Sequence, residues 1–305
     1  MTVGVVAPAS PTGENERTRF AVDIVRSFGF TVKEGRHLYR RDQYLAGTDE
    51  ERAEDLMAMF ADPSVDAIIC LRGGYGSSRI LPLLDYDVIR QSPKALIGYS
   101  DITSLLNAIF LKTGLIGFHG PIANQVFTDY TLAEFEKVLF EPQAPVRIGA
   151  APPFEAGPGR AEEENRLTVF RAGKARGRMV GGNLTLVSHL IGTPFEPDFR
   201  DRILVLEDVY EPPYSIDRML TQLWLAGRLQ QVAGVALGKF TEGEASGNSF
   251  SMEEVLRRRC EPLGVPVVRG LMIGHVEDQT VVPIGAMAEL DADAGTLTLL
   301  EEAVI

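Results

Sequence analysis

The first 120 residues alternate short apolar runs with helical patterns, and this alternation constrains the fold more than any other feature. The runs DAIICL and KALIG are apolar at consecutive positions rather than at every second one. Strands of this kind are typical of sheets that are buried on both faces, and such sheets are parallel with helical crossovers. Helices are expected between them, at 15–29, 49–62 and 101–112. The pattern therefore predicts an α/β fold with a doubly wound parallel sheet.

The stretch from 141 to 168 interrupts this rhythm with five prolines and the charged run RAEEENR. Such a change in composition indicates a domain boundary. Beyond it the chain is richer in strand patterns, among them RILVLEDV, VAGVALGKF and VVPIGAMAELDA. We predict a nucleophile-bearing domain over 1–145, a linker over 146–168 and a smaller, β-rich α/β domain over 169–305.

Charge and hydropathy disfavour several classes of partner. The formal net charge is −12, which would repel the phosphates of a nucleic acid. No apolar run reaches the ~18 residues that span a bilayer, and the first residues lack the pattern of a secretion signal. We therefore expect a cytoplasmic protein with no membrane or nucleic-acid partner. The two cysteines, Cys70 and Cys260, predict neither a disulfide nor a metal site, and no cofactor is expected.

A serine stands where a buried strand turns sharply into a helix, in the segment Gly98-Tyr99-Ser100-Asp101. A serine at such an elbow is exposed above the carboxyl end of the sheet, and the next backbone N–H lies at a helix N-terminus. The sequence departs from the general G-x-S-x-G elbow pattern. Two interpretations therefore stay open, a nucleophile or an ordinary N-cap of the following helix.

A serine nucleophile needs a base and a carboxylate that orients it. His119 ends a strand in GFHGP, whereas His275 follows an apolar strand and a glycine, a position suited to a cleft. Glu207 and Asp208 end the apolar run ILVLEDV, and a strand's carboxyl end suits a functional carboxylate. The remaining histidines and competing carboxylates are His37, expected to face solvent, His189, expected to pack on a helix, Glu277 and Asp278.

A glycine-rich turn, Arg72-Gly73-Gly74-Tyr75-Gly76, follows another strand. Glycines allow backbone N–H groups to approach a ligand closely, as an oxyanion hole or anion site requires. The turn lacks the Gly-Lys-Ser/Thr of a P-loop. It also lacks the spacing of a dinucleotide-binding turn, so we expect no nucleotide cofactor there.

Taken together, these segments resemble the LD-carboxypeptidase family of serine peptidases, which includes the muramoyltetrapeptide carboxypeptidases. The matching segments span nearly the whole chain in order: VGVVAPASP, YLAGTDEERAEDLMAMFADPSVDAIICLRGGYG, PKALIGYSDIT, GFHGP, GGNLTLVSHLIGTP, ILVLEDVYEPPYSIDRML and GHVEDQTVVPIG. The resemblance implies a flavodoxin-like N-terminal domain and a β-rich C-terminal domain. It also implies a homodimer.

The resemblance further implies a catalytic triad of Ser100, Glu207 and His275. Backbone N–H groups around Gly74 and Asp101 would form the oxyanion hole. The implied substrate is a murein tetrapeptide, from which the enzyme would release terminal D-alanine during peptidoglycan recycling.

The loop side chains Arg72 and Tyr75 are candidates for substrate binding. Many relatives carry a histidine shortly after GYSDIT, where this chain has Leu106 and Asn107. That histidine lies outside the triad, so the difference concerns the wall of the substrate pocket.

Three alternatives remain on the sequence alone. Microcin-immunity peptidases of the same family cleave aminoacyl-nucleotides and use an aromatic ring against the base, but Trp224 is expected in the core. A non-catalytic binding protein could use the same fold, although Ser, Glu and His are all present. An amidotransferase-like or dipeptidase-E-like hydrolase would place its nucleophile and histidine differently along the chain.

Overall fold

The computed structural model describes residues 1–155 and 157–304, and the chain divides into two compact units. The first unit consists of Met1–Phe127 with two short returning segments, Gly192–Pro197 and Pro283–Gly285. The rest of the described chain forms the second unit. Each unit has its own sheet.

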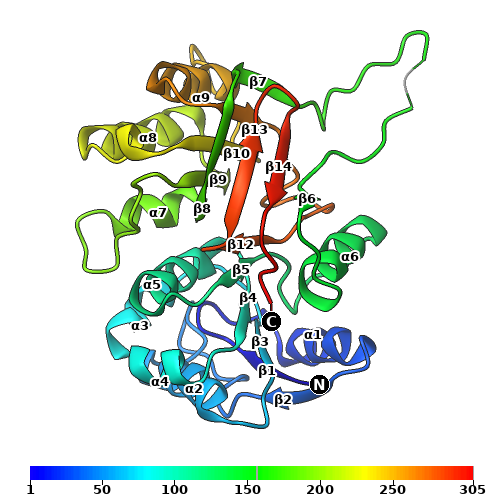
Figure 1. Ribbon diagram of the computed structural model, residues 1–305. Helices are drawn as coiled ribbons and strands as arrows, with labels where there is room; N and C mark the ends of the chain where they lie inside the picture. Colours follow the sequence, from blue (N-terminus) through cyan, green and yellow to red (C-terminus); the bar gives the residue numbers. More distant parts are fainter. Residues whose placement is uncertain (156, 305) are drawn as a thin grey trace. The chain divides into compact units, whose positions relative to one another are not determined.

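The first unit contains a six-stranded sheet with the order β12-β5-β4-β3-β1-β2. Strands β1 to β5 pair in parallel, and their order is that of a flavodoxin-like sheet. Helix α1 lies on one side of the sheet, and α2, α3, α4 and α5 lie on the other (Figure 1). The predicted doubly wound parallel fold is therefore confirmed. The bounds are β1 Thr2–Val6, α1 Asn15–Ser27, β2 Thr31–Glu34, α2 Asp49–Ala61, β3 Ala67–Cys70, α3 Ser77–Ile80, α4 Tyr86–Gln91, β4 Ala95–Ile97, α5 Thr103–Thr113, β5 Gly117–His119 and β12 Val282–Ile284.

Local signals set the ends of these helices. The side chain of Thr48 accepts a hydrogen bond from the Glu51 N–H at 3.2 Å, and the Glu51 carboxylate accepts one from the Thr48 N–H at 3.0 Å. This reciprocal capping box starts α2 at Asp49, the first residue of the predicted helix. Gly29, with φ +82°, follows α1 at the predicted terminating position. The apolar side chains of Leu105, Leu106 and Ile109 on α5 are buried, and so is Ile102 in the 3₁₀ turn just before it.

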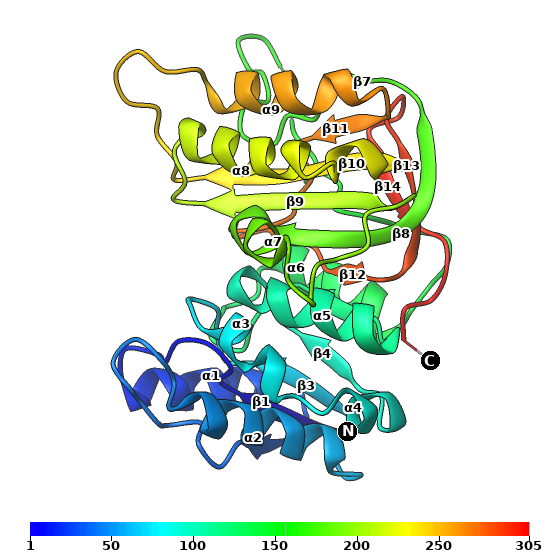
Figure 2. The same ribbon diagram turned by 90° about the vertical axis from the view of Figure 1, so that its left-hand side faces the viewer.

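The second unit contains an eight-stranded mixed sheet with the order β6-β14-β13-β8-β9-β10-β11-β7. Strands β8 to β11 pair in parallel, and the outer pairs are antiparallel. Helices α7, α8 and α9 lie along one face of the central strands (Figure 2). The bounds are α6 Asp129–Phe135, β6 Val146–Ile148, β7 Thr168–Arg171, β8 Lys174–Asn183, α7 Leu184–Leu190, β9 Ile203–Val209, α8 Pro213–Leu225, β10 Gly234–Thr241, α9 Met252–Cys260, β11 Val267–Arg269, β13 Met287–Asp291 and β14 Thr296–Leu299.

The units divide the chain differently from the predicted domain boundaries. The second unit takes in the segment from 128 onward, so it is larger than predicted, and residues 146–148 of the expected linker form β6. The run 281–292, expected as one strand, is two strands in two different sheets. Gly285 separates them with φ +103°, and a Cβ there would lie 2.4 Å from the ring of Phe110. Only glycine fits that conformation and that contact.

Individual burial predictions gave mixed results. Cys70 and Cys260 are buried free thiols. The prediction that Trp224 belongs to the core is wrong, because it is 47% exposed on α8. The prediction that His37 faces solvent is also wrong, since it is 9% exposed and its backbone N–H donates to the Asp55 carboxylate at 2.9 Å. No helix in the described part of the chain is long and apolar enough to cross a membrane.

Candidate active site

Ser100 stands at a strained backbone position directly after β4. Its φ is +63°, a left-handed value that costs an L-residue roughly 1–2 kcal/mol. Such strain persists only where the surrounding structure imposes it, and it concentrates at functional sites. The residues 100–102 form a single 3₁₀ turn that leads into α5. The predicted strand-to-helix elbow is therefore present.

The alternative interpretation of Ser100 as a helix cap is wrong. In the described chain, Tyr99 is the N-cap residue of the 3₁₀ turn and Ile102 is that of α5, so Ser100 occupies neither N-cap position. Neither side chain makes a capping hydrogen bond there. Capping of the helix N-terminus therefore does not explain the serine at this position.

The glycine-rich turn after β3 packs directly on the serine. A Cβ at Gly73 would lie 2.8 Å from Cβ and 3.1 Å from Oγ of Ser100, so only glycine allows this approach. The next residue, Gly74, has φ +110°, and a Cβ there would lie 2.5 Å from Oγ of Ser10. Ser10 follows β1 and accepts a hydrogen bond from the Tyr75 N–H at 3.1 Å. The neighbouring carboxyl ends of β1, β3 and β4 thus bring these loops together.

The sequence analysis named the turn with Gly73 and Gly74, but it did not predict the contact of Gly73 with Ser100, and it missed Ser10. The signals were the paired glycines and the serine that ends VVAPAS just beyond the first strand. Neither signal identifies a contact by itself, because the contacts come from the order of the strands.

The second unit holds a buried carboxylate–imidazole pair. Oε2 of Glu207, on β9, lies 2.8 Å from Nδ1 of His275, which sits in the loop that follows β11. The Glu207 side chain is fully buried and that of His275 is 18% exposed. A carboxylate that accepts from Nδ1–H fixes the tautomer in which Nε2 is the free base. This pair has the geometry of the base and orienting acid of a hydrolase.

The loop that carries His275 is tied to the neighbouring strand β10. The Lys239 N–H donates to the Ile273 carbonyl at 2.9 Å, and the Thr241 hydroxyl donates to the His275 carbonyl at 3.3 Å. Gly274 has φ +109°, and a Cβ there would lie 2.4 Å from Oε2 of Glu207. The glycine therefore lets the loop pass directly over the carboxylate.

Replacing Gly274 with alanine is expected to lower the free energy of unfolding by about 3 kcal/mol or more, because backbone strain and a clash with Glu207 add together. Gly264→Ala is the matched control, since Gly264 has φ +80° but open space around it. The control should cost only about 1–2 kcal/mol. Urea unfolding followed by circular dichroism measures both. Equal losses in the two variants would show that the contact with Glu207 carries no energy.

The neighbouring acid, Asp208, has a separate structural role. Its carboxylate accepts hydrogen bonds from the Asn183 amide at 2.9 Å and from the N–H and hydroxyl of Thr185, each at 2.9 Å. Burial, together with the charge of Glu207, raises the pKa of Asp208 to about 6, although these hydrogen bonds oppose the rise. Asp208 thus joins β9 to the start of α7 and contributes negative charge near the pair.

The electrostatic setting raises the pKa of the His275 imidazole. Burial by itself lowers this pKa, but the hydrogen bond and charge of Glu207 outweigh burial, with help from Asp208 and Glu242. The result lies above the ordinary value of 6.5. The site therefore stabilises the protonated imidazolium of His275, paired with the Glu207 carboxylate.

The competing candidates occupy other places. The Asp278 carboxylate accepts from the Thr128 hydroxyl at 2.7 Å, so the acid bonded to His275 is Glu207. His119 is fully buried, with its ring edge-on to Tyr99 at 6.0 Å between centroids. His189 is exposed on α7, so the expectation that it packs on its helix is wrong.

The two candidate substrate-binding side chains, Arg72 and Tyr75, differ in their contacts and exposure. Arg72 donates from Nη1 to the Pro11 carbonyl at 3.1 Å, which holds it against the loop after β1. Tyr75 is 52% exposed and packs edge-on against Tyr44 at 5.8 Å between ring centroids. Both lie on the loop that packs on Ser100. Within the described residues, no cluster of three or more histidine, cysteine, aspartate or glutamate side chains could hold a metal ion.

Comparison with known proteins gives matches along the length of the chain. Residues 3–120 match the LD-carboxypeptidase N-terminal domain, and residues 176–290 match the LD-carboxypeptidase C-terminal domain. A protein of Bacillus subtilis named "Probable murein peptide carboxypeptidase" is 39% identical, with 98% of this chain and 91% of that protein covered. The murein tetrapeptide carboxypeptidase of Pseudomonas aeruginosa is 33% identical, with 95% and 93% covered.

A solved structure is similar to the chain as a whole. The structure of MccF in complex with glutamyl sulfamoyl guanosine superposes with a TM-score of 0.89 at 28% sequence identity, and it covers 100% of this chain and 97% of that one. A microcin C7 self-immunity protein MccF is known from Escherichia coli. The similar proteins thus include both murein peptide carboxypeptidases and a microcin self-immunity protein.

Proposed function

Because the chain belongs to the LD-carboxypeptidase family, we propose that this peptidase is a serine carboxypeptidase with the triad Ser100, Glu207 and His275. The observation that carries the proposal is the 2.8 Å pairing of Glu207 with His275, two residues separated by 68 positions. The strained elbow at Ser100, in the first unit, is the second observation that supports the proposal. The proposal assigns the nucleophile to the first unit and the other two residues to the second unit.

The proposed mechanism is acyl transfer through a covalent intermediate. His275 takes the proton of the Ser100 hydroxyl as the oxygen attacks the scissile carbonyl, while Glu207 stabilises the imidazolium. The backbone N–H groups of Gly74 and Asp101 donate to the tetrahedral oxyanion. His275 then gives the proton to the leaving amine, and water hydrolyses the acyl-enzyme by the same route.

The proposed substrate is the murein tetrapeptide L-Ala-γ-D-Glu-meso-diaminopimelate-D-Ala, cleaved at the bond to the terminal D-alanine. The murein peptide carboxypeptidases among the relatives support this choice. A carboxypeptidase must also bind a terminal carboxylate, and we propose that Arg72 and Tyr75 of the loop after β3 contribute to that site. Release of this D-alanine would place the enzyme in peptidoglycan recycling in the cytoplasm, acting as a homodimer without a cofactor.

The direct test is D-alanine release from the tetrapeptide by the purified protein. We expect the terminal D-alanine to be released from the tetrapeptide, and no L-alanine to be released from a control tetrapeptide that ends in L-alanine. Release from both would contradict the L,D specificity. Size-exclusion chromatography with light scattering, run on the same sample, tests the homodimer.

A second candidate function is cleavage of aminoacyl-nucleotide amides. The superposition with MccF bound to glutamyl sulfamoyl guanosine favours this candidate specifically. Incubation with an aminoacyl sulfamoyl nucleoside distinguishes the two functions. Cleavage of that compound without D-alanine release would replace the first proposal by the second.

The raised pKa of His275 predicts the pH dependence of the reaction. A general base acts in its neutral form, so kcat/KM should fall as the pH drops through the raised pKa, and the acidic limb should lie above pH 6.5. A limb at or below pH 6.5 would contradict the assignment.

The same pKa shift affects stability with a defined sign. The pKa of His275 is raised in the folded protein, so the protonated His275–Glu207 pair stabilises the fold fully below the ordinary pKa. This contribution is lost as the pH rises through the folded value.

In Glu207→Gln the acidic limb of the rate profile should move to lower pH, since the carboxylate that raises the pKa of His275 is gone. NMR titration of the His275 ring checks the same shift without turnover.

A further inference from the structure

We propose that the buried side chain of Asp101 is a positioning residue that holds the glycine-rich loop against the nucleophile and so fixes the spacing of the two oxyanion donors. This inference rests on the proposed function, in which one donor is the N–H of Asp101 itself and the other is the N–H of Gly74. One residue would then supply one donor through its backbone and place the other through its carboxylate.

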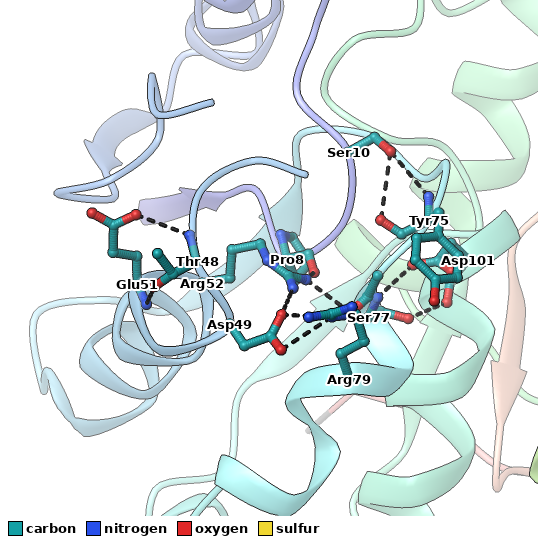
Figure 3. A network of polar contacts seen from close by, with 11 residues as sticks. Pro8, Ser10, Thr48, Asp49, Glu51, Arg52, Tyr75, Ser77, Arg79 and Asp101 are labelled. Carbon is teal, nitrogen blue, oxygen red and sulfur yellow. Dashed lines mark hydrogen bonds and ion pairs between the residues drawn. The ribbon is translucent and has the colours of Figure 1, made fainter. Parts of the chain in front are cut away.

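Two hydrogen bonds join the elbow to the loop in opposite directions. The Asp101 carboxylate, whose residue is 2% exposed, accepts from the Ser77 N–H at 2.7 Å. The Ser77 hydroxyl, fully buried, donates back to the Asp101 carbonyl. The nearby backbone of Gly76 also lowers the pKa of this carboxylate. Figure 3 shows Ser77 beside Asp101 at the right-hand end of this network.

The loop is held from its other side by a buried arginine. Nη1 of Arg52, on α2, donates to the carbonyl of Gly76 at 2.8 Å and to that of Pro8 at 2.5 Å. The Arg52 side chain is fully buried, and its Nη2 pairs with Asp49. Asp49 in turn accepts from Nε of Arg79 at 2.8 Å (Figure 3). Both arginines thus share the carboxylate of Asp49, and the charge of Asp101 also acts on Arg52.

Consecutive loop residues are therefore each bonded to a different part of the first unit. Tyr75 is held by Ser10 after β1, Gly76 by Arg52 on α2, and Ser77 by Asp101 at the elbow. The glycine pair just before them packs on Ser100 and Ser10. With three successive residues anchored, the N–H of Gly74 has a fixed position relative to the N–H of residue 101.

Burying a carboxylate is costly unless hydrogen bonds replace its water. Burial raises the pKa of Asp101, and the hydrogen bonds from Ser77 and Gly76 and the charge of Arg52 oppose that rise. An apolar residue would fill the same space without this cost but could not orient the Ser77 N–H. The chemistry of the site therefore favours a positioning role over packing.

The test compares Asp101→Ala and Asp101→Asn with the control Asp85→Ala. Asp85 also accepts from two backbone N–H groups, at 3.0 and 3.1 Å, but it caps α4 in the same unit. Each variant is assayed for kcat and KM with the murein tetrapeptide. Each is also assayed for inhibition by the tripeptide aldehyde, in which the bond to D-alanine is replaced by an aldehyde that adds the serine oxygen to form a hemiacetal.

We expect Asp101→Ala to lower kcat by about 10²–10³-fold with KM within about threefold, because mainly the transition state uses the oxyanion donors. Inhibition by the aldehyde should weaken by a similar factor. Asp101→Asn should recover part of both losses, since its amide oxygen can still accept from the Ser77 N–H. Asp85→Ala should change neither quantity by more than about threefold.

Amide hydrogen exchange of Ser77 gives a readout that needs no substrate. This amide should be protected in the wild type and exchange faster in the Asp101 variants, while Asp85→Ala leaves it protected. Unchanged exchange, or kcat and aldehyde inhibition as in the control, would overturn the proposal. If the wild type neither releases D-alanine nor reacts with the aldehyde, the proposed function fails, and the exchange data still decide whether Asp101 anchors the loop.

Discussion

Replacing Ser100 with alanine is expected to reduce D-alanine release from the murein tetrapeptide by at least about 10⁴-fold, because no other group can form the acyl-enzyme. Removing the nucleophile of a triad leaves only the small rate that binding and the oxyanion hole provide. KM should change little, since the hydroxyl contributes mainly to the transition state. A coupled assay for free D-alanine with a detection limit near the uncatalysed rate measures the loss.

The matched control for this variant is Ser104→Ala. Ser104 lies one helical turn further along, on α5, and its hydroxyl bonds to that of Ser78 at 2.8 Å. Loss of that partly buried hydrogen bond should cost about 1 kcal/mol of stability but leave kcat within a few-fold. Mass spectrometry with a fluorophosphonate should label the wild type and the control at Ser100 and leave Ser100→Ala unlabelled. Undiminished release by Ser100→Ala would exclude the serine mechanism.

Replacing Glu207 with glutamine is expected to reduce kcat by about 10³–10⁴-fold at neutral pH. The amide is nearly isosteric, but it carries no charge to stabilise the imidazolium, and its NH₂ can donate to Nδ1 and so stabilise the wrong tautomer. The fold should persist, because the side chain still fills the same fully buried site. The measurement is kcat across the pH range, together with the NMR titration of His275.

Asp208→Asn is the control for the charge of this strand end. Asp208 lies beside Glu207 but bonds to Asn183 and Thr185 rather than to the imidazole. We expect its kcat to stay within about tenfold of the wild type, with an acidic limb at slightly lower pH because one negative charge is removed. Equal losses in the two variants would mean that net charge, not the hydrogen bond to His275, supports the reaction.

Much of the site could be predicted because its signals are local. The apolar run before Ser100 and the helical spacing after it occupy adjacent positions, so one short stretch of sequence is enough to predict the elbow. Glu207 was singled out by its place at the end of an apolar strand, and His275 by a glycine just before it. The resemblance to a family then selected among candidates that residue types alone left open, such as His119 and Asp278.

Other features could not be predicted because they depend on partners far along the chain. His37 looks polar in its local segment, but its backbone N–H bonds to Asp55 from another element. The helical pattern around Trp224 is amphipathic, yet the exposed side of α8 carries the tryptophan. The split of 281–292 between two sheets follows from a contact of Gly285 with Phe110, 175 positions away by their residue numbers.

The sequence by itself determined the alternation of strands and helices, the capping box of α2 and the elbow at Ser100, since each depends on side chains within a few positions of one another. Only the tertiary structure showed the hydrogen bond between Glu207 and His275, which residue types alone left open, and the hold of Asp101 and Arg52 on the same loop. The physical reason is that hydrogen bonds between distant residues follow from the order and register of the strands that carry them. Local propensity is set by neighbours along the chain, and it leaves that order open.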